Sequence, residues 1–168
     1  MKFKFLRYKT KSYLRKNKTL RYNEAYKKAV SIGLIFTVED RQKHDQIKNL
    51  IRKFEHDGKK VKTLAYLPRN QENYEFMFDF FTYREISFWG NITANSALEF
   101  ADAPFDFLLY LDANPNDLIL NVVAKSKAKC RIGKFWKEGE PFFEMLIENK
   151  GDSKVLLEEL YKYVTALR

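Results

Sequence analysis

The sequence has few of the residues on which small disulfide-bonded proteins and common catalytic sites depend. Among its 168 residues there are one cysteine, two histidines, six glycines and four prolines. A single cysteine excludes an intramolecular disulfide framework, so we expect a reducing compartment. The scarcity of glycine and proline, beside an aromatic content of 16%, excludes a low-complexity chain and indicates a folded protein.

Long apolar runs are also missing. No stretch reaches about 18 apolar residues, the length that a membrane-spanning helix requires. The first residues, MKFKFLRYKTKSYLRK, lack the apolar core of a secretory signal peptide. Together these absences predict a cytoplasmic protein.

Acidic residues are nearly absent from the N-terminal segment. Residues 1–29 hold eleven Lys or Arg and a single acid, Glu24, whereas residues 30–168 hold 20 basic and 21 acidic residues. The whole net positive charge of the protein, +9, therefore comes from this segment. Apolar residues recur there at helical spacings, with a break near Asn17. We expect residues 1–30 to form a basic, helical arm whose apolar stripe packs on another surface.

Beyond the arm, short apolar runs alternate with amphipathic segments. The run SIGLIFTVED is typical of a strand buried on both faces, and the helical pattern after it lies between a capping Asp40 and Gly58. The alternation predicts strands at residues 31–40, 59–68, 83–91, 106–111, 129–136 and 141–149, and helices at residues 40–58, 70–81, 92–101, 116–128 and 151–168.

This order of elements predicts an α/β three-layer sandwich with a mostly parallel, Rossmann-like sheet of five or six strands, preceded by the basic helical arm. The chain then divides into the arm, residues 1–30, and a single α/β domain, residues 31–168. The connection at residues 133–141 is short and contains Gly139. We therefore expect the last two strands to form an antiparallel hairpin at an edge of the sheet.

The single cysteine, Cys130, stands between Lys129 and Arg131 in the segment AKSKAKCRIG. Successive side chains of a strand point to opposite faces, so neither cation would lie beside the thiol and lower its pKa. We expect Cys130 to be a buried hydrophobic residue rather than a nucleophile.

Two resemblances involve the same region. The stretch FDFLLYLDANPNDLILNVVAKSKAKCRIGKF, with the basic arm and SIGLIFTVED, resembles an uncharacterised family of short proteins common in Bacteroidota, which share an AxSKAKxxIG-like stretch. This resemblance covers nearly the whole chain and implies a cytoplasmic α/β protein without implying an activity. Residues 105–135 alone are similar to the N-terminal half of heptosyltransferase-type glycosyltransferases, where a strand ending in Asp leads through a helix to a GAxxRIG turn. No catalytic residue follows from that similarity, because such enzymes hold their sugar nucleotide with a second Rossmann-like domain.

The ends of the predicted strands offer one candidate site, because open α/β sheets bind ligands beyond the carboxyl ends of their strands. The polar residues there are Glu39, Asp40, Arg69, Asn70, Asp112 and Asn114. They would serve a small enzyme or a ligand-binding domain. The competing interpretation is that Asp40, Asn70 and Asp112 are helix caps and turn residues. No glycine-rich phosphate loop follows the first strand, and we predict neither a cofactor nor a bound metal ion.

The basic arm is the other candidate site. Cations interleaved with aromatic residues suit a phosphate backbone and exposed bases. We therefore expect a non-enzymatic binding protein whose arm contacts RNA or a ribonucleoprotein such as the ribosome; an anionic membrane surface and an acidic protein are the alternative partners. The predicted contact residues are Arg7, Lys9, Lys11, Tyr13, Arg15, Lys16, Lys18, Arg21 and Tyr22, with Tyr8 as a further stacking residue.

Overall fold

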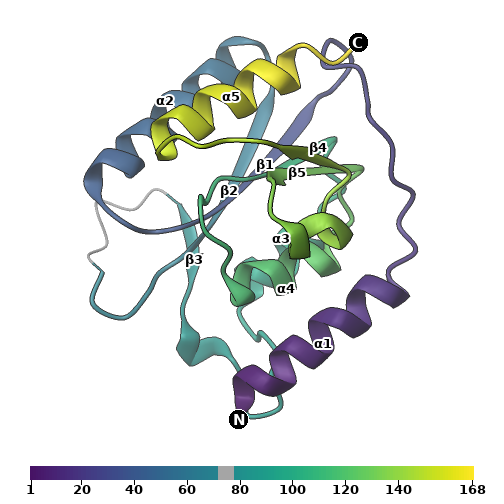
Figure 1. The fold of residues 1–168 in the computed structure, drawn as a ribbon, viewed down its shortest axis with the longest axis vertical. Coiled ribbons are helices and arrows are strands. Elements are labelled where there is room, and N and C mark those ends of the chain that lie inside the picture. Colours follow the sequence, from purple (N-terminus) through teal and green to yellow (C-terminus); the bar gives the residue numbers. More distant parts are fainter. Residues whose placement is uncertain (72–77) are drawn as a thin grey trace.

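The computed structural model describes residues 1–71 and 78–168, and in them the chain forms one sheet of six parallel strands (Figure 1). The strands are β1 (Ser31–Thr37), β2 (Lys60–Tyr66), β3 (Asp79–Phe81), β4 (Phe107–Tyr110), β5 (Cys130–Lys134) and β6 (Met145–Ile147). Their order across the sheet is β3-β2-β1-β4-β5-β6. This is the order of Rossmann-like proteins, so the predicted fold class is confirmed.

Helices cover both faces of the sheet (Figure 1). The α-helices are α1 (Lys2–Lys16), α2 (Arg41–His56), α3 (Asn95–Asp102), α4 (Asp117–Lys125) and α5 (Ser153–Thr165), and two short 3-10 helices, η1 (Tyr83–Glu85) and η2 (Lys137–Phe142), lie in the connections. One face of the sheet packs against α2 and α5, and the other against α3 and α4. The predicted caps of α2 are confirmed: the Asp40 side chain accepts a hydrogen bond from the Lys43 N–H, and Gly58 has a φ of +81°.

The two central strands, β1 and β4, are buried on both faces, which explains their continuous apolar sequences. Ile35 and Leu108 contribute to the core beneath α3 and α4. Phe36 and Leu109, one position further along each strand, contribute to the core beneath α2 and α5. Each strand thus joins two separate hydrophobic cores across the sheet.

The arm adds a further layer outside α4. Its helix, α1, ends at Lys16, next to the expected break at Asn17, and packs along α4 rather than on the sheet. Leu6 of α1 has no exposed surface and belongs to the core that includes α3 and α4. Thr10, also buried, accepts a hydrogen bond of 2.9 Å from Asn121 of α4. A buried polar pair of this kind fixes one helix against the other, because any other register would leave both groups unpaired.

The sequence of α4 is apolar on opposite sides, because the helix lies between the sheet and α1. All seven residues from Leu118 to Ala124 are buried, so the helix has no solvent face over two turns. A helix that is apolar nearly all round requires partners on opposite sides. The sheet with α3 supplies one side, and α1 supplies the other.

After α1, residues 17–30 continue in a largely non-helical course past the amino-terminal ends of the strands to the layer of α5 (Figure 1). The Asn17 side chain donates hydrogen bonds to the backbone oxygens of Ala124 and Ser126, at 2.9 and 3.0 Å. The Tyr26 N–H donates to the Leu167 oxygen at 3.0 Å, which brings this segment beside the C-terminus. The prediction of a helical arm therefore holds for residues 2–16 only.

The prediction of the third strand was wrong in position. Half of the predicted helix at residues 70–81, namely residues 72–77, lies outside the described residues, and its last part is strand β3. The predicted strand at residues 83–91 is instead a 3-10 turn followed by a loop with an isolated bridge between Ile86 and Ile92. Gly90, whose φ is +76°, lies in that loop against the backbone of Leu6 in α1. The segment packs against α1 and does not extend the sheet.

The predicted hairpin at the end of the sheet was also wrong. β6 pairs with β5 in parallel, with Ile132 opposite Met145. The connection crosses a face of the sheet through η2 and buries Phe143, which stacks on Tyr110 with ring centroids 6.0 Å apart. Gly139 does not form a hairpin turn; a Cβ atom there would lie 2.5 Å from the Trp136 ring, so the indole packs against bare backbone. Burial of these aromatic rings determined the crossing, and loop length alone does not reveal it.

Candidate functional site

The strand-end candidate is centred on Asp112, which follows β4 and is only 3% exposed. Its carboxylate accepts hydrogen bonds from the Thr37 N–H at 2.8 Å and the Thr37 hydroxyl at 2.6 Å. The Lys43 ammonium, which is 2% exposed, donates to the same carboxylate at 2.6 Å. The two charges therefore form a buried ion pair between β1 and β4, the position at which the strand order reverses.

Lys43 makes two further contacts that complete its surroundings. Its ammonium donates to the Thr37 backbone oxygen and to the Glu39 carboxylate, each at 3.0 Å. A lysine has three N–H donors, so all of them are used. The hollow beside these groups measures only about 10 Å³, which is barely the space of one water molecule. In this arrangement the crevice where related folds bind nucleotides is filled by the protein's own side chains.

The structure brings some of the strand-end residues together and separates others. Glu39 and Asp112 share Lys43, and Asp40 caps α2. Arg69 instead lies over the Tyr83 ring, 3.8 Å from its centroid. Asn70 has a φ of +63°, as turn residues often do, and the Asn114 backbone oxygen accepts a hydrogen bond from the Tyr110 hydroxyl at 3.3 Å.

Sequence reasoning missed Lys43, although the sequence contained a signal. Lys43 precedes Ile47 by four residues and Leu50 by seven, which puts it on the apolar face of α2. Lysines at such positions are ordinarily assumed to extend to solvent. Its burial depends on Asp112, which lies 69 residues further along the chain, so the helical pattern alone did not reveal it.

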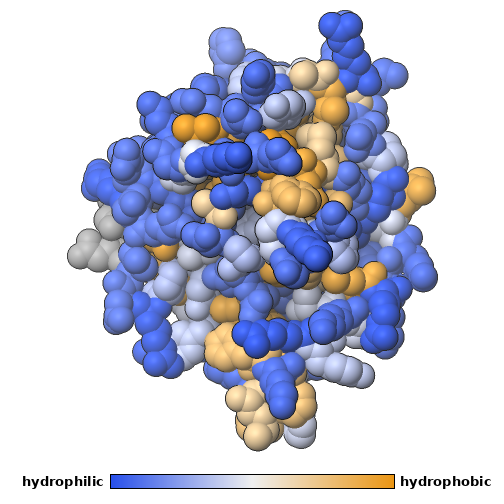
Figure 2. All heavy atoms as spheres, in the orientation of Figure 1, coloured by the Kyte–Doolittle hydropathy of each residue, from blue (hydrophilic) through white to orange (hydrophobic). Residues whose placement is uncertain are grey.

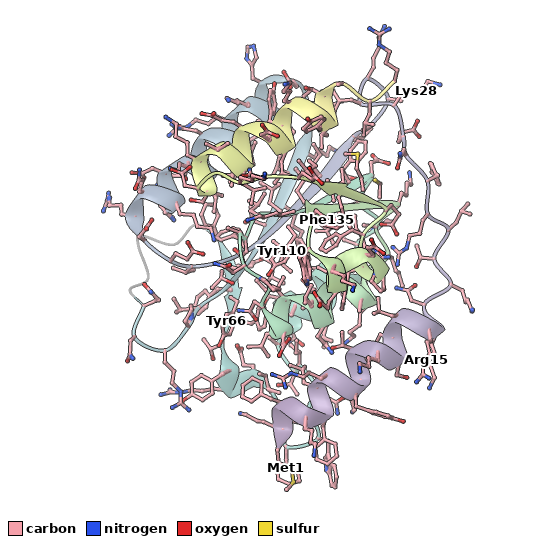
Figure 3. All side chains as sticks on the ribbon, viewed as in Figure 1. Met1, Arg15, Lys28, Tyr66, Tyr110 and Phe135 are labelled. Atoms are coloured by element: carbon pink, nitrogen blue, oxygen red, sulfur yellow. The ribbon has the colours of Figure 1, made fainter. Side chains whose placement is uncertain are left out.

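On α1, the predicted nucleic-acid residues separate into free and engaged groups. Three cations, Lys4, Lys11 and Arg15, lie with Tyr8 on the side of the helix that faces away from α4, and Arg7 lies at the edge of that side towards the start of α4. All five side chains are exposed, and we call them the outer basic face. Figure 3 labels Arg15 near the end of α1, on the outside of the molecule. Within residues 1–71 and 78–168, Arg7 is the only one of these cations that forms an ion pair, with Asp117 at 2.6 Å.

The other predicted residues of the arm contact the body of the protein to different degrees. Lys9 donates a hydrogen bond to the Asn91 side chain, and the ring of Tyr13 lies 5.0 Å from the Lys125 ammonium. Lys16 and Lys18 are exposed at the end of the helix. Tyr22 is exposed, and its backbone N–H donates to the Lys129 oxygen.

Arg21 has a structural environment that differs from the rest of the arm. Its guanidinium lies 3.4 Å from the Glu144 carboxylate, which also binds Arg131 at 2.8 Å, and it donates a hydrogen bond to the Ala128 backbone oxygen. Burial, and then the neighbouring Arg131, lower the pKa of Arg21 to about 10, while Glu144 opposes them. Arg21 therefore stays charged at neutral pH, but it is used to attach the arm to β5 and the loop before β6.

Two surface features adjoin the outer basic face. At the N-terminal end, Phe5 packs on Phe88 and Trp89, with ring centroids 6.2 and 5.3 Å away, and both partners are 60% exposed. In the orientation of Figure 1, hydrophobic residues are visible at the end of the molecule where Met1 lies (Figures 2 and 3).

The second feature is a groove of about 390 Å³ between α1, the start of α4 and η2. Its apolar lining consists of Leu14, Pro115, Leu120, Trp136, Pro141 and Phe142, and its polar lining of Arg7, Thr10, Lys11, Asp117 and Glu138. The groove volume falls within the range of about 300–1,000 Å³ typical of small-ligand pockets. None of its wall residues was predicted as a site except Arg7 and Lys11, because the wall is assembled from three separate parts of the chain.

The predicted burial of Cys130 is confirmed, but the prediction that neither neighbouring cation lowers the pKa of its thiol is wrong for Arg131. The Cys130 side chain is fully buried in the core beneath α2 and α5. Burial raises the pKa of its thiol to about 12, and Glu144 adds to that effect while Arg131 opposes it. A thiol with such a pKa is almost wholly protonated at neutral pH and is therefore a poor nucleophile.

Within the described residues, no helix combines the length and the apolar character needed to cross a bilayer. In the same part of the chain, no three His, Cys, Asp or Glu side chains are placed to share a metal ion.

Comparison with known proteins identifies the family of this chain. No curated protein and no solved structure shows significant similarity to this sequence. A family of unknown function, DUF6913, matches residues 2–167, so the match includes α1 as well as the α/β domain. The chain belongs to the DUF6913 family.

Proposed function

We propose that this protein is a non-enzymatic RNA-binding protein that contacts RNA, free or within a ribonucleoprotein, through the outer basic face of α1. The observation that carries the proposal is the combination of free charge and fixed geometry on this helix. Lys4, Lys11 and Arg15 are exposed and form no ion pair within the described residues. The same helix is fixed to α4 by Leu6 and Thr10, so its cations are held on a rigid support.

Fixed geometry matters because binding then costs less ordering entropy. A disordered basic tail loses conformational freedom when it binds, whereas a docked helix has lost it already. Cations one turn apart on such a helix can neutralise successive phosphates, with release of the counterions bound to the nucleic acid. Tyr8 on the same face, and Trp89 beside its N-terminal end, offer exposed rings for stacking.

The packing of α1 favours RNA over a membrane surface. An interfacial helix inserts its apolar side into the lipid. In this protein that side is occupied, because Leu6 is fully buried and Thr10 bonds to Asn121. The opposite face is cationic, with Tyr8 as its aromatic member. The exposed apolar residues are confined to the N-terminal end of the helix, where they are Phe3 and the N-cap Met1.

The strand-end residues give less support to an enzyme or ligand-binding domain. Asp112 and Lys43 satisfy each other, and the hollow beside them has almost no free volume. A ligand would have to break a buried ion pair to enter. We therefore propose a structural role for these groups and a binding role for α1.

The test compares two triple variants that remove the same charge. In the first, Lys4, Lys11 and Arg15 are changed to Gln; in the control, the exposed Lys60, Lys150 and Lys154 are changed to Gln. The probe is a labelled RNA stem-loop with a single-stranded tail, titrated by fluorescence anisotropy at several salt concentrations. For the wild type, log K should fall linearly with log salt.

We expect the α1 variant to reduce the steepness of that slope by about 2, since each lost phosphate contact on a single strand contributes about 0.7. The control variant should retain the wild-type slope, and both variants should unfold within about 0.5 kcal/mol of the wild type because all six sites are exposed. Equal affinities and slopes for the two variants, or salt-independent binding, would contradict the proposal.

A further inference from the structure

The groove beside α1 has a flat aromatic wall that is held rigidly. The Trp136 ring packs on the bare backbone at Gly139 and meets the Phe143 ring edge-on, with centroids 5.8 Å apart and planes at 68°. The indole is therefore fixed on its inner side and partly exposed on the groove side. A fixed indole beside Leu14 and Leu120 favours a planar apolar ligand, because such a ligand can stack without reordering the wall.

The charges at the rim of the groove are arranged with opposite signs. Lys11 of the outer basic face lies on the α1 side and forms no ion pair in the part of the chain that the structure describes. Glu138 lies on the η2 side, is exposed, and also forms no ion pair there. Asp117, at the start of α4, is bound to Arg7. A complementary ligand has an anionic group towards Lys11 and N–H donors towards Glu138.

We infer that this groove binds an unpaired guanine of the RNA, with the base stacked on Trp136 and a neighbouring phosphate at Lys11; the inference rests on the RNA-binding function proposed above. Guanine presents two adjacent N–H donors on its pairing edge, which match the two oxygens of a carboxylate. Uracil presents one N–H between two carbonyl oxygens, which a carboxylate repels. The groove thus adds base preference to the sequence-independent attraction of the outer basic face.

Tryptophan fluorescence gives a direct test, because the protein has only two tryptophans, Trp89 and Trp136. In a Trp89→Phe variant the signal comes from the groove alone. The probes are two heptaribonucleotides, UUUGUUU and UUUUUUU. We expect the guanine-containing probe to quench Trp136 to saturation and to bind about tenfold more tightly than the uridine probe. The reciprocal Trp136→Phe variant should lose this preference and retain the salt-dependent binding.

A second pair of variants separates base recognition from simple electrostatics. Glu138→Gln removes the carboxylate at the groove, and Glu140→Gln removes another exposed carboxylate outside it. If charge alone mattered, both changes would strengthen the binding of both probes. We expect Glu138→Gln to lower the affinity for the guanine probe by about tenfold or less and to raise the affinity for the uridine probe slightly. Glu140→Gln should change the affinity for both probes by the same factor.

The possible failures are distinguishable. Salt-dependent binding of both probes without guanine preference, or with equal responses to the two glutamate variants, would overturn the guanine site and leave the proposed RNA-binding function standing. Absence of binding by any RNA probe would overturn both. Quenching of Trp136 by an acidic peptide rich in Leu and Phe, with no quenching by either oligonucleotide, would assign the groove to a protein partner and overturn the inference.

Discussion

Lys43 and Lys11 represent two regions of the protein in which the same side chain has opposite surroundings. Lys43 lies at the carboxyl ends of β1 and β4, is 2% exposed, and uses its donors on Thr37, Glu39 and Asp112. Lys11 lies on the outer basic face of α1, exposed and without an ion pair among the described residues. Both belong to helices with one buried face, yet only Lys43 is on that face.

This difference shows why position within a familiar fold is a poor guide to function. The strand-end cluster occupies the point where Rossmann-like folds bind ligands, but its charges are internally compensated. The outer basic face lies on a helix added outside the sandwich, and most of its charges are exposed and form no ion pair within the described residues. The free charges therefore make α1 the proposed binding surface, and the paired charges at the strand ends indicate that those groups stabilise the folded core.

The largest effect should come from breaking the buried ion pair. Lys43→Met keeps most of the apolar stem of the side chain and leaves the Asp112 carboxylate buried without its cation, while the Thr37 N–H and hydroxyl still donate to it. We expect a loss of about 3–5 kcal/mol in the free energy of unfolding, measured by urea denaturation. The matched change Lys11→Met should alter that free energy by less than about 0.5 kcal/mol.

A double variant sharpens this result. Lys43→Met combined with Asp112→Asn removes both charges and still leaves an amide oxygen for the Thr37 N–H. It should be more stable than Lys43→Met alone, because no uncompensated charge remains. Equal stability of Lys43→Met, Lys11→Met and the wild type would contradict the conclusion that Lys43 is part of the folded core and Lys11 is not.

The next effect concerns the support of the outer basic face. Leu6 is fully buried in the core that includes α3 and α4, and its backbone lies against Gly90, whereas Tyr8, two residues later, is 68% exposed. Leu6→Ala should lower the free energy of unfolding by roughly 3 kcal/mol, from lost burial and the cavity that remains. Tyr8→Ala should change it by about 0.5 kcal/mol or less. If the two variants were equally stable, α1 would be a detachable arm rather than a layer of the fold.

The smallest effect concerns the Asp106–Lys129 ion pair, which is less buried than Lys43–Asp112 and less exposed than the outer basic face. The Asp106 side chain is 10% exposed and the Lys129 side chain is 31% exposed. Burial by itself raises the pKa of Asp106, but hydrogen bonds from Lys129 and from the N–H groups of Val30 and Ser31 more than offset it. The net result is a pKa below the ordinary 3.8. A depressed carboxyl pKa contributes stability above the ordinary pKa, and this contribution is lost as the pH falls through the folded-state value.

Asp106→Asn should therefore cost about 1 kcal/mol at neutral pH and progressively less below about pH 4. Unfolding curves of the variant and the wild type, recorded between about pH 2 and pH 7, would measure the difference. A difference that stays constant over that range would show that Asp106 acts through packing and not through its charge.

Local patterns in the sequence were sufficient for most of the elements. The continuous apolar run at β1, the capping Asp40 and Gly58 of α2, and the helical spacing of residues 2–16 each depend on neighbours within a few positions. The concentration of positive charge in the first 29 residues is likewise a property of the sequence itself. The burial of Cys130 was predicted from strand alternation, although alternation does not keep Arg131 from acting on the thiol.

Tertiary structure alone decided which charges are free. Lys43 is paired because Asp112, far away in the chain, lies beside it, and Arg21 is engaged because β5 and the loop before β6 bring Arg131 and Glu144 together. The parallel course of β6 and the groove at Trp136 arose in the same way, from aromatic rings of one connection packing on a distant core. Sequence periodicity reports which side of an element is apolar, but the identity of the partner depends on contacts between residues that are remote in the chain.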